Sequence, residues 1–181
     1  MNYYGAKDLA AAFRTVRKNT VVIAGEIGDE HYGFRATSET RTIAQTLVHI
    51  AMGTNVAEQI HAVEKRTTLE GFDFPRFMSG LIAEEQTPRS KAQIVALLSE
   101  NGDRFGQWLE GLQEDFLAQR VTMPAGMSPA SRTRFEMLLG VKEHEMHHRG
   151  QLMLLERLVG LVPHLTREML ARMSAMQAAK A

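Results

Sequence analysis

Residues 144–151 read HEMHHRGQ and place three of the seven histidines of the chain within five positions. A neutral imidazole is the side chain that proteins most often use to bind a transition metal. The octet lies in a long stretch of helical periodicity, residues 131–159, in which side chains three or four positions apart share one face. We therefore expect a helix that presents a pair of histidines to a common point.

Helical phase separates the three histidines of the octet. With Val141 as the origin and about 100° per residue, Leu152 and the other apolar side chains define one buried stripe. His148 falls inside this stripe and His144 falls at its edge, whereas His147 points towards the flank. We therefore expect His144 and His148 to face the interior of the protein.

Two inward imidazoles can share a metal ion or can simply be hydrogen-bonded in the core. An unpaired buried polar group costs about 1–3 kcal/mol, and a shared ion removes that cost, so we favour metal binding. A catalytic site usually has three protein ligands and an open position. Residues 40–63 offer His49 and His61 as the third ligand, and the apolar periodicity of this segment slightly favours His61. The pattern of residues alone leaves this ligand open.

The rest of the chain is also predominantly helical. All five prolines fall between periodic segments, where they do not interrupt a helix. Long helices are expected over residues 8–27, 40–63, 90–116 and 131–159, with a shorter one over 166–177. Asp8 is the expected N-cap of the first helix, and Ser90 with Gln93 forms a capping box at the third. Because no segment alternates with a period of two, we predict an all-α four-helix bundle.

The connection between the second and third predicted helices is unusually long. It spans about 25 residues, whereas links within bundles usually span about 2–8, so the two helices that it joins can run parallel. The segment carries several large apolar side chains, including Phe72, Phe77 and Leu81. We expect it to cover the core on one face of the bundle; the alternative is that it forms the wall of a pocket.

Length and composition limit the possible functions. The 181 residues suit one domain over 1–181, with a core over about 8–160 and a helical appendage over about 163–181. Twenty-one basic residues balance 21 acidic ones, so neither nucleic acid nor a membrane is an expected partner. The absence of cysteine excludes disulfides, Cys-ligated zinc and a protein thiol nucleophile. Residues 1–18 lack the pattern of a secretory signal, and we expect a cytoplasmic protein.

Two motifs resemble those of the DinB/YfiT-like family. The octet, followed by Leu152, is similar to the H-x-x-x-H-R-G-Q signature of that family, and residues 46–50, TLVHI, resemble its second histidine motif. The resemblance extends from about Leu9 to Gly160. It implies a four-helix bundle in up-down-down-up order with the long crossover between helices two and three.

The same resemblance implies a site and a chemistry. His49, His144 and His148 would hold one divalent metal ion, most commonly zinc or nickel, so the resemblance supplies His49 as the third ligand. It further implies a homodimer and a small-molecule substrate. The expected activity is that of a metal-dependent transferase or hydrolase, including activation of a low-molecular-weight thiol for transfer or isomerisation.

Two other functions compete with this one. Residues 144–148 also match the H-E-x-x-H motif of zinc metallopeptidases, in which Glu145 would be the general base and Glu168 a further ligand. Arg172 and Pro163 depart from that pattern, and no strands are predicted for substrate alignment. A metal-stabilised bundle that acts as a non-enzymatic binding module or sensor is the second alternative. Arg149 and Gln151 either support the site or lie on a solvated face.

Overall fold

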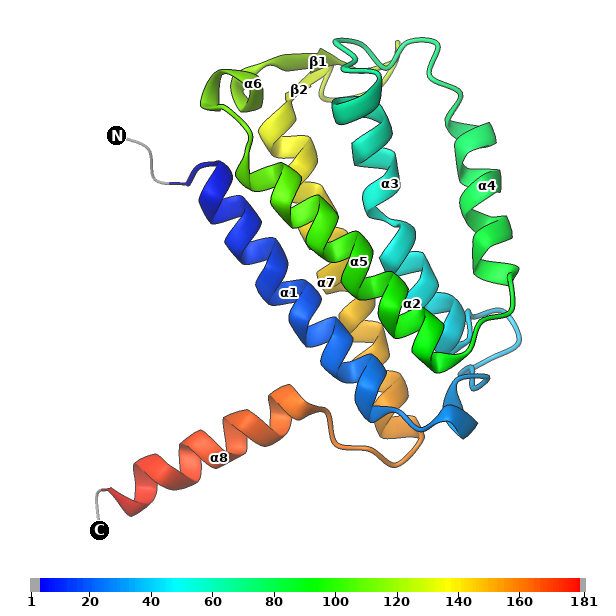
Figure 1. The fold of residues 1–181 in the computed structure, drawn as a ribbon, viewed down its shortest axis with the longest axis vertical. Coiled ribbons are helices and arrows are strands. Elements are labelled where there is room, and N and C mark those ends of the chain that lie inside the picture. The colour runs from blue at the N-terminus through cyan, green and yellow to red at the C-terminus, as the bar shows by residue number, and fades with distance from the viewer. Residues whose placement is uncertain (1–3, 180–181) are drawn as a thin grey trace.

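The computed structural model describes residues 4–179; the two ends of the predicted domain, 1–3 and 180–181, lie outside the described residues. Four long helical segments form a bundle (Figure 1). They are α1 (Ala6–Glu26), α2 (Ile43–Met52) with its continuation α3 (Thr54–Ala57), α5 (Lys91–Glu110) and α7 (Arg134–Leu158). Both α1 and α2 pack against α5 and α7. Because α2 and α5 run in the same direction, opposite to α1 and α7, the predicted up-down-down-up order is confirmed.

Local capping explains where the first and third long helices begin. Ser90 and Gln93 form the predicted capping box of α5. The prediction for α1 was wrong in detail, since Gly5 is the N-cap and Asp8 is the third residue of the helix. The Asp8 carboxylate accepts the N–H of Gly5 at 3.0 Å. A carboxylate can satisfy a free backbone N–H of the first turn either from the N-cap or from the third residue of the helix. The presence of Asp8 near the helix start therefore does not show which of the two positions it occupies.

The second predicted helix is divided into three parts. It begins at Ile43 after a capping box formed by Thr42 and Gln45, and α2 ends at Met52, just before Gly53. The short helix α3 then leads into a π-helical turn, η2 (Glu58–Val63). A π turn is wider than an α turn, so a constant angle per residue does not hold across the predicted range of 40–63.

The long crossover contains a helix that the sequence did not reveal, α4 (Phe74–Gln86). Its N-cap is Asp73, which accepts the N–H of Arg76 at 3.0 Å. Helix α4 packs on the outer face of α2 and buries Leu81 and Glu85. The expected core cover is therefore present, and Leu81 also lines a cavity, so the segment forms a pocket wall as well.

One end of the bundle departs from the predicted helices. Helix α5 ends at Glu110, and the short helix α6 (Glu114–Ala118) follows. Strands β1 (Arg120–Thr122) and β2 (Ser131–Thr133) form a small antiparallel hairpin, so α7 begins at Arg134 rather than at 131. Three-residue strands are too short to show a two-residue alternation. A capping box of Thr133 and Glu136 starts α7.

A buried polar layer divides the apolar core into two clusters. Ile23, Leu47, Leu98 and Leu152 are central to one cluster, and Phe13, Phe105 and Leu138 are central to the other. Between them, Nη2 of Arg17 donates to Glu145 Oε2 at 2.9 Å, and the Thr20 hydroxyl donates to Glu145 Oε1 at 2.7 Å. Gly102 leaves the space for Arg17, because a Cβ there would lie 2.6 Å from Arg17 Cγ.

The last helix, α8 (His164–Ala178), extends away from the bundle (Figure 1). It matches the short helix predicted over 166–177. The chain turns towards it at Gly160, which has a φ of +85° and is favoured there because it lacks a Cβ. Within residues 4–179, no helix has the length and apolar character needed to cross a membrane.

Glu156 near the end of α7 makes stability depend on pH. Its side chain is fully buried, and neither carboxylate oxygen has a hydrogen-bond partner among the described residues. Burial, with a smaller contribution from Glu26, raises the pKa of Glu156 to about 7. The pKa of Glu156 is therefore higher in the folded than in the unfolded protein. Its contribution to the free energy of unfolding is complete below about pH 4.5 and is lost as the pH rises through about 7.

Replacing Glu156 with Gln is therefore expected to have a pH-dependent effect on stability. At pH 8 the variant should be more stable than the wild type by on the order of 3 kcal/mol, since each unit by which the pKa is raised corresponds to about 1.4 kcal/mol. At pH 4.5 the advantage should largely disappear. Urea unfolding of both proteins at the two pH values measures the difference, and parallel pH profiles would contradict the assignment.

Candidate metal centre

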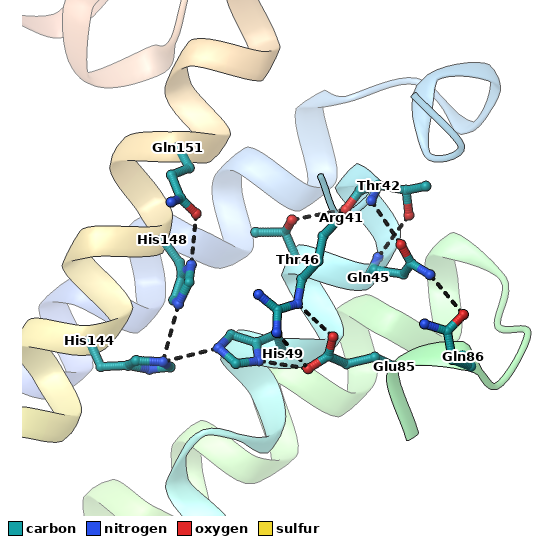
Figure 2. Close-up of polar contacts among 10 residues, drawn as sticks. All are labelled: Arg41, Thr42, Gln45, Thr46, His49, Glu85, Gln86, His144, His148 and Gln151. Carbon is teal, nitrogen blue, oxygen red and sulfur yellow. Dashed lines mark hydrogen bonds and ion pairs between the residues drawn. The ribbon is translucent and has the colours of Figure 1, made fainter. Parts of the chain in front are cut away.

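Three imidazoles converge between α2 and α7. Nε2 of His144 lies 3.0 Å from Nε2 of His49 and 3.1 Å from Nε2 of His148. Figure 2 shows the three rings directed towards one another. In a tetrahedral zinc site with Zn–N distances of about 2.0–2.1 Å, neighbouring ligand atoms are separated by about 3.3 Å. The spacing therefore suits a single divalent ion.

Hydrogen bonds to the Nδ1 atoms of two of the rings determine their tautomers and direct their Nε2 atoms towards the centre of the cluster. Nδ1 of His49 lies 2.7 Å from Glu85 Oε1, and Nδ1 of His148 lies 2.8 Å from Gln151 Oε1. Because both oxygens accept, each Nδ1 carries the proton and each Nε2 presents a lone pair. His144 can donate its single Nε2 proton to only one of them, so protein hydrogen bonds alone do not satisfy the three rings. A cation at their centre does.

The carboxylate behind His49 is itself held in place. Nε of Arg41 donates to Glu85 Oε2 at 2.6 Å, so that Arg41, Glu85 and His49 form a chain of contacts (Figure 2). Partners of this kind orient a ligating histidine and raise its basicity. Gln151 has the corresponding role at His148. No hydrogen bond links Arg149 to the three histidines within residues 4–179, so Gln151 alone of the two supports the site.

Burial keeps the cluster in the form that binds metal. It lowers the pKa of His144 to about 4, with help from the neighbouring His148 and His49 rings. Burial also lowers the pKa of His49 and of His148, although Glu85 and Gln151 oppose this effect. The three imidazoles are therefore neutral near pH 7, as a ligand must be.

Gly53 makes room for the His144 ring. A Cβ at this position would lie 3.3 Å from both Cε1 and Nδ1 of His144. The glycine that ends α2 therefore also permits α7 to place His144 beside α2.

The structure agrees with the helical phase predicted for α7. His148 is buried and His144 is half-buried at the cluster, whereas His147 is exposed and contacts the Gln151 side chain. The slight preference for His61 over His49 was wrong, because His61 lies outside the cluster. Almost every position of α2 from Ile43 to Ala51 is buried, since α4 covers its outer face. No single apolar stripe therefore distinguishes the two histidines.

The acidic residues of the peptidase hypothesis lie elsewhere. The Glu145 carboxylate points towards α1, where it is bound by Arg17 and Thr20. Glu168 lies on α8 and pairs with Arg172 at 3.8 Å. Neither carboxylate reaches the three histidines, so the H-E-x-x-H arrangement of base and ligands is not formed.

Glu85 and Arg41 are site residues that the sequence analysis missed. The available signal was Asp73 as an N-cap, followed by Pro75 in a first turn and apolar side chains three or four residues apart. These features define α4 and place Glu85 one turn after the buried Leu81.

Removing the Glu85 carboxylate is expected to weaken metal binding. Glu85→Ala should lower the affinity by about 10- to 100-fold, the usual effect of losing such a partner. Competition with a chromogenic chelator measures it. Glu84→Ala is the matched control. Glu84 lies next to Glu85 on α4, but its carboxylate pairs with Arg89 rather than with His49. Equal affinities for the two variants would contradict the role of Glu85.

A largely apolar cavity of about 300 Å³ adjoins the cluster. His49 and His144 form part of its wall. Other lining residues come from α3, η2, α4 and α7 and include Val56, Ile60, Phe74, Met78, Met137 and Val141. A small molecule with an apolar body can therefore lie next to the three histidines.

The fold and the site together define a class of four-helix bundles with a three-histidine centre between the second and fourth long helices. The sequence matches the model of the DinB superfamily over residues 12–152, and the chain belongs to this superfamily. No curated protein sequence gives a significant match.

Two solved structures from Bacillus subtilis share the fold. YfiT, described as a probable metal-dependent hydrolase with an unusual four-helix bundle topology, is 16% identical with a TM-score of 0.66. That match covers 89% of this chain and 91% of YfiT. The DinB-like protein YjoA is 18% identical with a TM-score of 0.57, over 84% of this chain and 92% of YjoA.

Proposed function

We propose that this protein is a metal-dependent enzyme in which His49, His144 and His148 hold one divalent ion. The observation that carries the proposal is the convergence of three Nε2 atoms, together with the hydrogen bonds that engage the Nδ1 atoms of His49 and His148. Three imidazole donors suit zinc, and nickel is the second candidate. When bound, such an ion supplies Lewis-acid chemistry and lowers the pKa of a water or thiol at its open position.

The residues around the cluster have distinct roles in this proposal. Glu85 and Gln151 keep two rings in the tautomer that ligates, and Arg41 holds the Glu85 carboxylate in place. The apolar walls of the adjoining cavity exclude water and take up the body of the substrate. The reaction is attack by a small nucleophile on a small, mostly apolar electrophile.

Water and a low-molecular-weight thiol are the two nucleophiles to compare. The likeness of the fold to YfiT supports hydrolysis. The absence of cysteine means that any thiol must come from a cosubstrate. Zinc-loaded, nickel-loaded and chelator-treated protein should be assayed against aryl esters and epoxides, with and without small thiols. Metal-dependent turnover of esters alone supports a hydrolase, and turnover that needs the thiol supports a transferase.

A non-enzymatic module would give a different result in the same assay. It would retain the ion and bind small molecules, but no member of the panel would be turned over. Stoichiometric metal binding without turnover would therefore favour a sensor or binding role.

We also propose that the protein is a homodimer. Several large apolar side chains on α8 are about half exposed, among them Met169, Leu170 and Met173. A second copy that covers them would remove this surface from water. Sedimentation equilibrium should give twice the mass of one chain, and the mass of a monomer at micromolar concentration would contradict the proposal.

A further inference from the structure

His61 lies in the cavity beside the candidate metal centre but takes no part in the cluster. It is carried by the π turn η2, its side chain is 1% exposed, and it lines the same space as His49 and His144. Single π turns occur frequently at functional sites. The other lining residues are almost all apolar, so His61 is the polar group of the cavity that the metal centre does not explain.

Arg134 fixes the tautomer of His61. Nη1 of Arg134 lies 2.8 Å from Nδ1 of His61. A guanidinium can only donate, so Nδ1 is the acceptor and the proton of the neutral ring lies on Nε2. Burial and the charge of Arg134 lower the pKa of His61 to about 4, so the ring is neutral at pH 7.

Arg134 is held so that it cannot turn away from His61. It is 1% exposed and also donates to Gln119 Oε1 at 3.1 Å and to the carbonyl of Lys65 at 3.2 Å. Its guanidinium lies over the Phe116 ring at 4.5 Å. None of these partners is a carboxylate, so the positive charge polarises the His61 ring and strengthens its remaining N–H as a donor.

That remaining N–H has no protein acceptor. Nε2 of His61 forms no hydrogen bond with any residue between 4 and 179, and it is not among the polar atoms sealed from solvent. This polarised donor lines an apolar cavity and has no protein partner among the described residues, so a ligand oxygen that replaces water there can accept its hydrogen bond.

We propose that His61 is a specificity-determining residue whose Nε2–H donates to an acceptor oxygen of the substrate. The substrate class is a small molecule with an apolar body, a carbonyl-type oxygen at the His61 end and its reacting group at the three-histidine end. This inference rests on the proposed function, since it assigns the substrate of the same cavity. The hydrogen bond from His61 would be a second contact with the substrate in the cavity, separate from the three histidines.

Imidazole nitrogen NMR tests the donor directly. In chelator-treated protein labelled with ¹⁵N, His61 should show a protonated Nε2 and an unprotonated Nδ1 at pH 7. Adding 4-phenyl-2-butanone should shift the His61 Nε2 resonance, whereas ethylbenzene, which lacks an acceptor, should leave it in place. A proton on Nδ1, or no shift with the ketone, would overturn the proposal.

Variants test whether the hydrogen bond contributes to affinity. His61→Gln retains an acceptor for Arg134 and a donor for the ligand, and should bind the ketone nearly as well as the wild type. His61→Leu combined with Arg134→Met removes the donor without leaving a buried charge unpaired, and should bind the ketone about 3- to 10-fold more weakly. Ethylbenzene should not distinguish the three proteins. A double variant that binds the ketone as tightly as the wild type would overturn the proposal.

The metal is measured separately in the same samples. If the wild type fails to bind zinc but His61 still responds to the ketone, the proposed function fails and the ligand contact remains. If zinc binds and His61 does not respond, only the inference about His61 fails.

Discussion

Replacing His148 with alanine is expected to reduce the bound metal from one ion per chain to nearly none. The change removes one of three donors and leaves His49 and His144, and two imidazoles hold a divalent ion poorly. It also frees Gln151 from its contact with Nδ1. Elemental analysis of protein loaded with zinc or nickel and then dialysed measures the ratio of metal to protein.

His147→Ala is the matched control for this experiment. His147 is an exposed neighbour on the same helix and lies outside the cluster, so its removal should leave one ion per chain. Circular dichroism of both variants should show the helical content of the wild type. An unchanged metal content in His148→Ala would disprove the assignment, and so would loss of the ion in His147→Ala alone.

Replacing Glu145 with alanine is expected to cost about 3–5 kcal/mol of unfolding free energy, the usual effect of removing one partner of a buried ion pair. Both members are almost fully buried, between the two apolar clusters. The substitution leaves the Arg17 guanidinium without its carboxylate, and the Thr20 hydroxyl keeps only the more distant Val16 carbonyl as an acceptor, at 3.2 Å. Urea unfolding measures the difference.

Two further variants separate the structural role of Glu145 from a catalytic one. Arg17→Met combined with Glu145→Leu should cost much less than the sum of the single changes, because no charge is then left unpaired. Glu145→Gln should retain one ion per chain. A Glu145→Ala variant that loses less than about 1 kcal/mol, compared with a typical 3–5, would contradict the importance of this pair.

The bundle could be predicted because its long helices carry sustained periodicity and clear capping signals such as Ser90 with Gln93. The parts that were missed are those in which the local signal is short or altered by neighbours. Strand β1 has only three residues, Arg120–Thr122. The π turn η2 changes the angle per residue within a segment that otherwise looks like one continuous helix.

The candidate site was predictable to different degrees on its two helices. One side of α7 faces the interior, so helical phase alone selects His144 and His148. Helix α2 is buried on nearly all sides, so phase is uninformative and only the family resemblance points to His49. Glu85 approaches from a crossover helix, and its contact with His49 depends on how α4 packs, which no local pattern of residues encodes.

The three donors come from parts of the chain that are far apart, since His49 and His144 are separated by 95 positions. An ion held by them would act as a reversible cross-link that closes a long loop, and the unfolded chain could not bind it comparably well. By mass action, each tenfold rise in free ion above the dissociation constant would add about 1.4 kcal/mol to the stability of the fold. The amount of folded protein in a cell would then follow metal supply, which couples the lifetime of the chain to the availability of the ion.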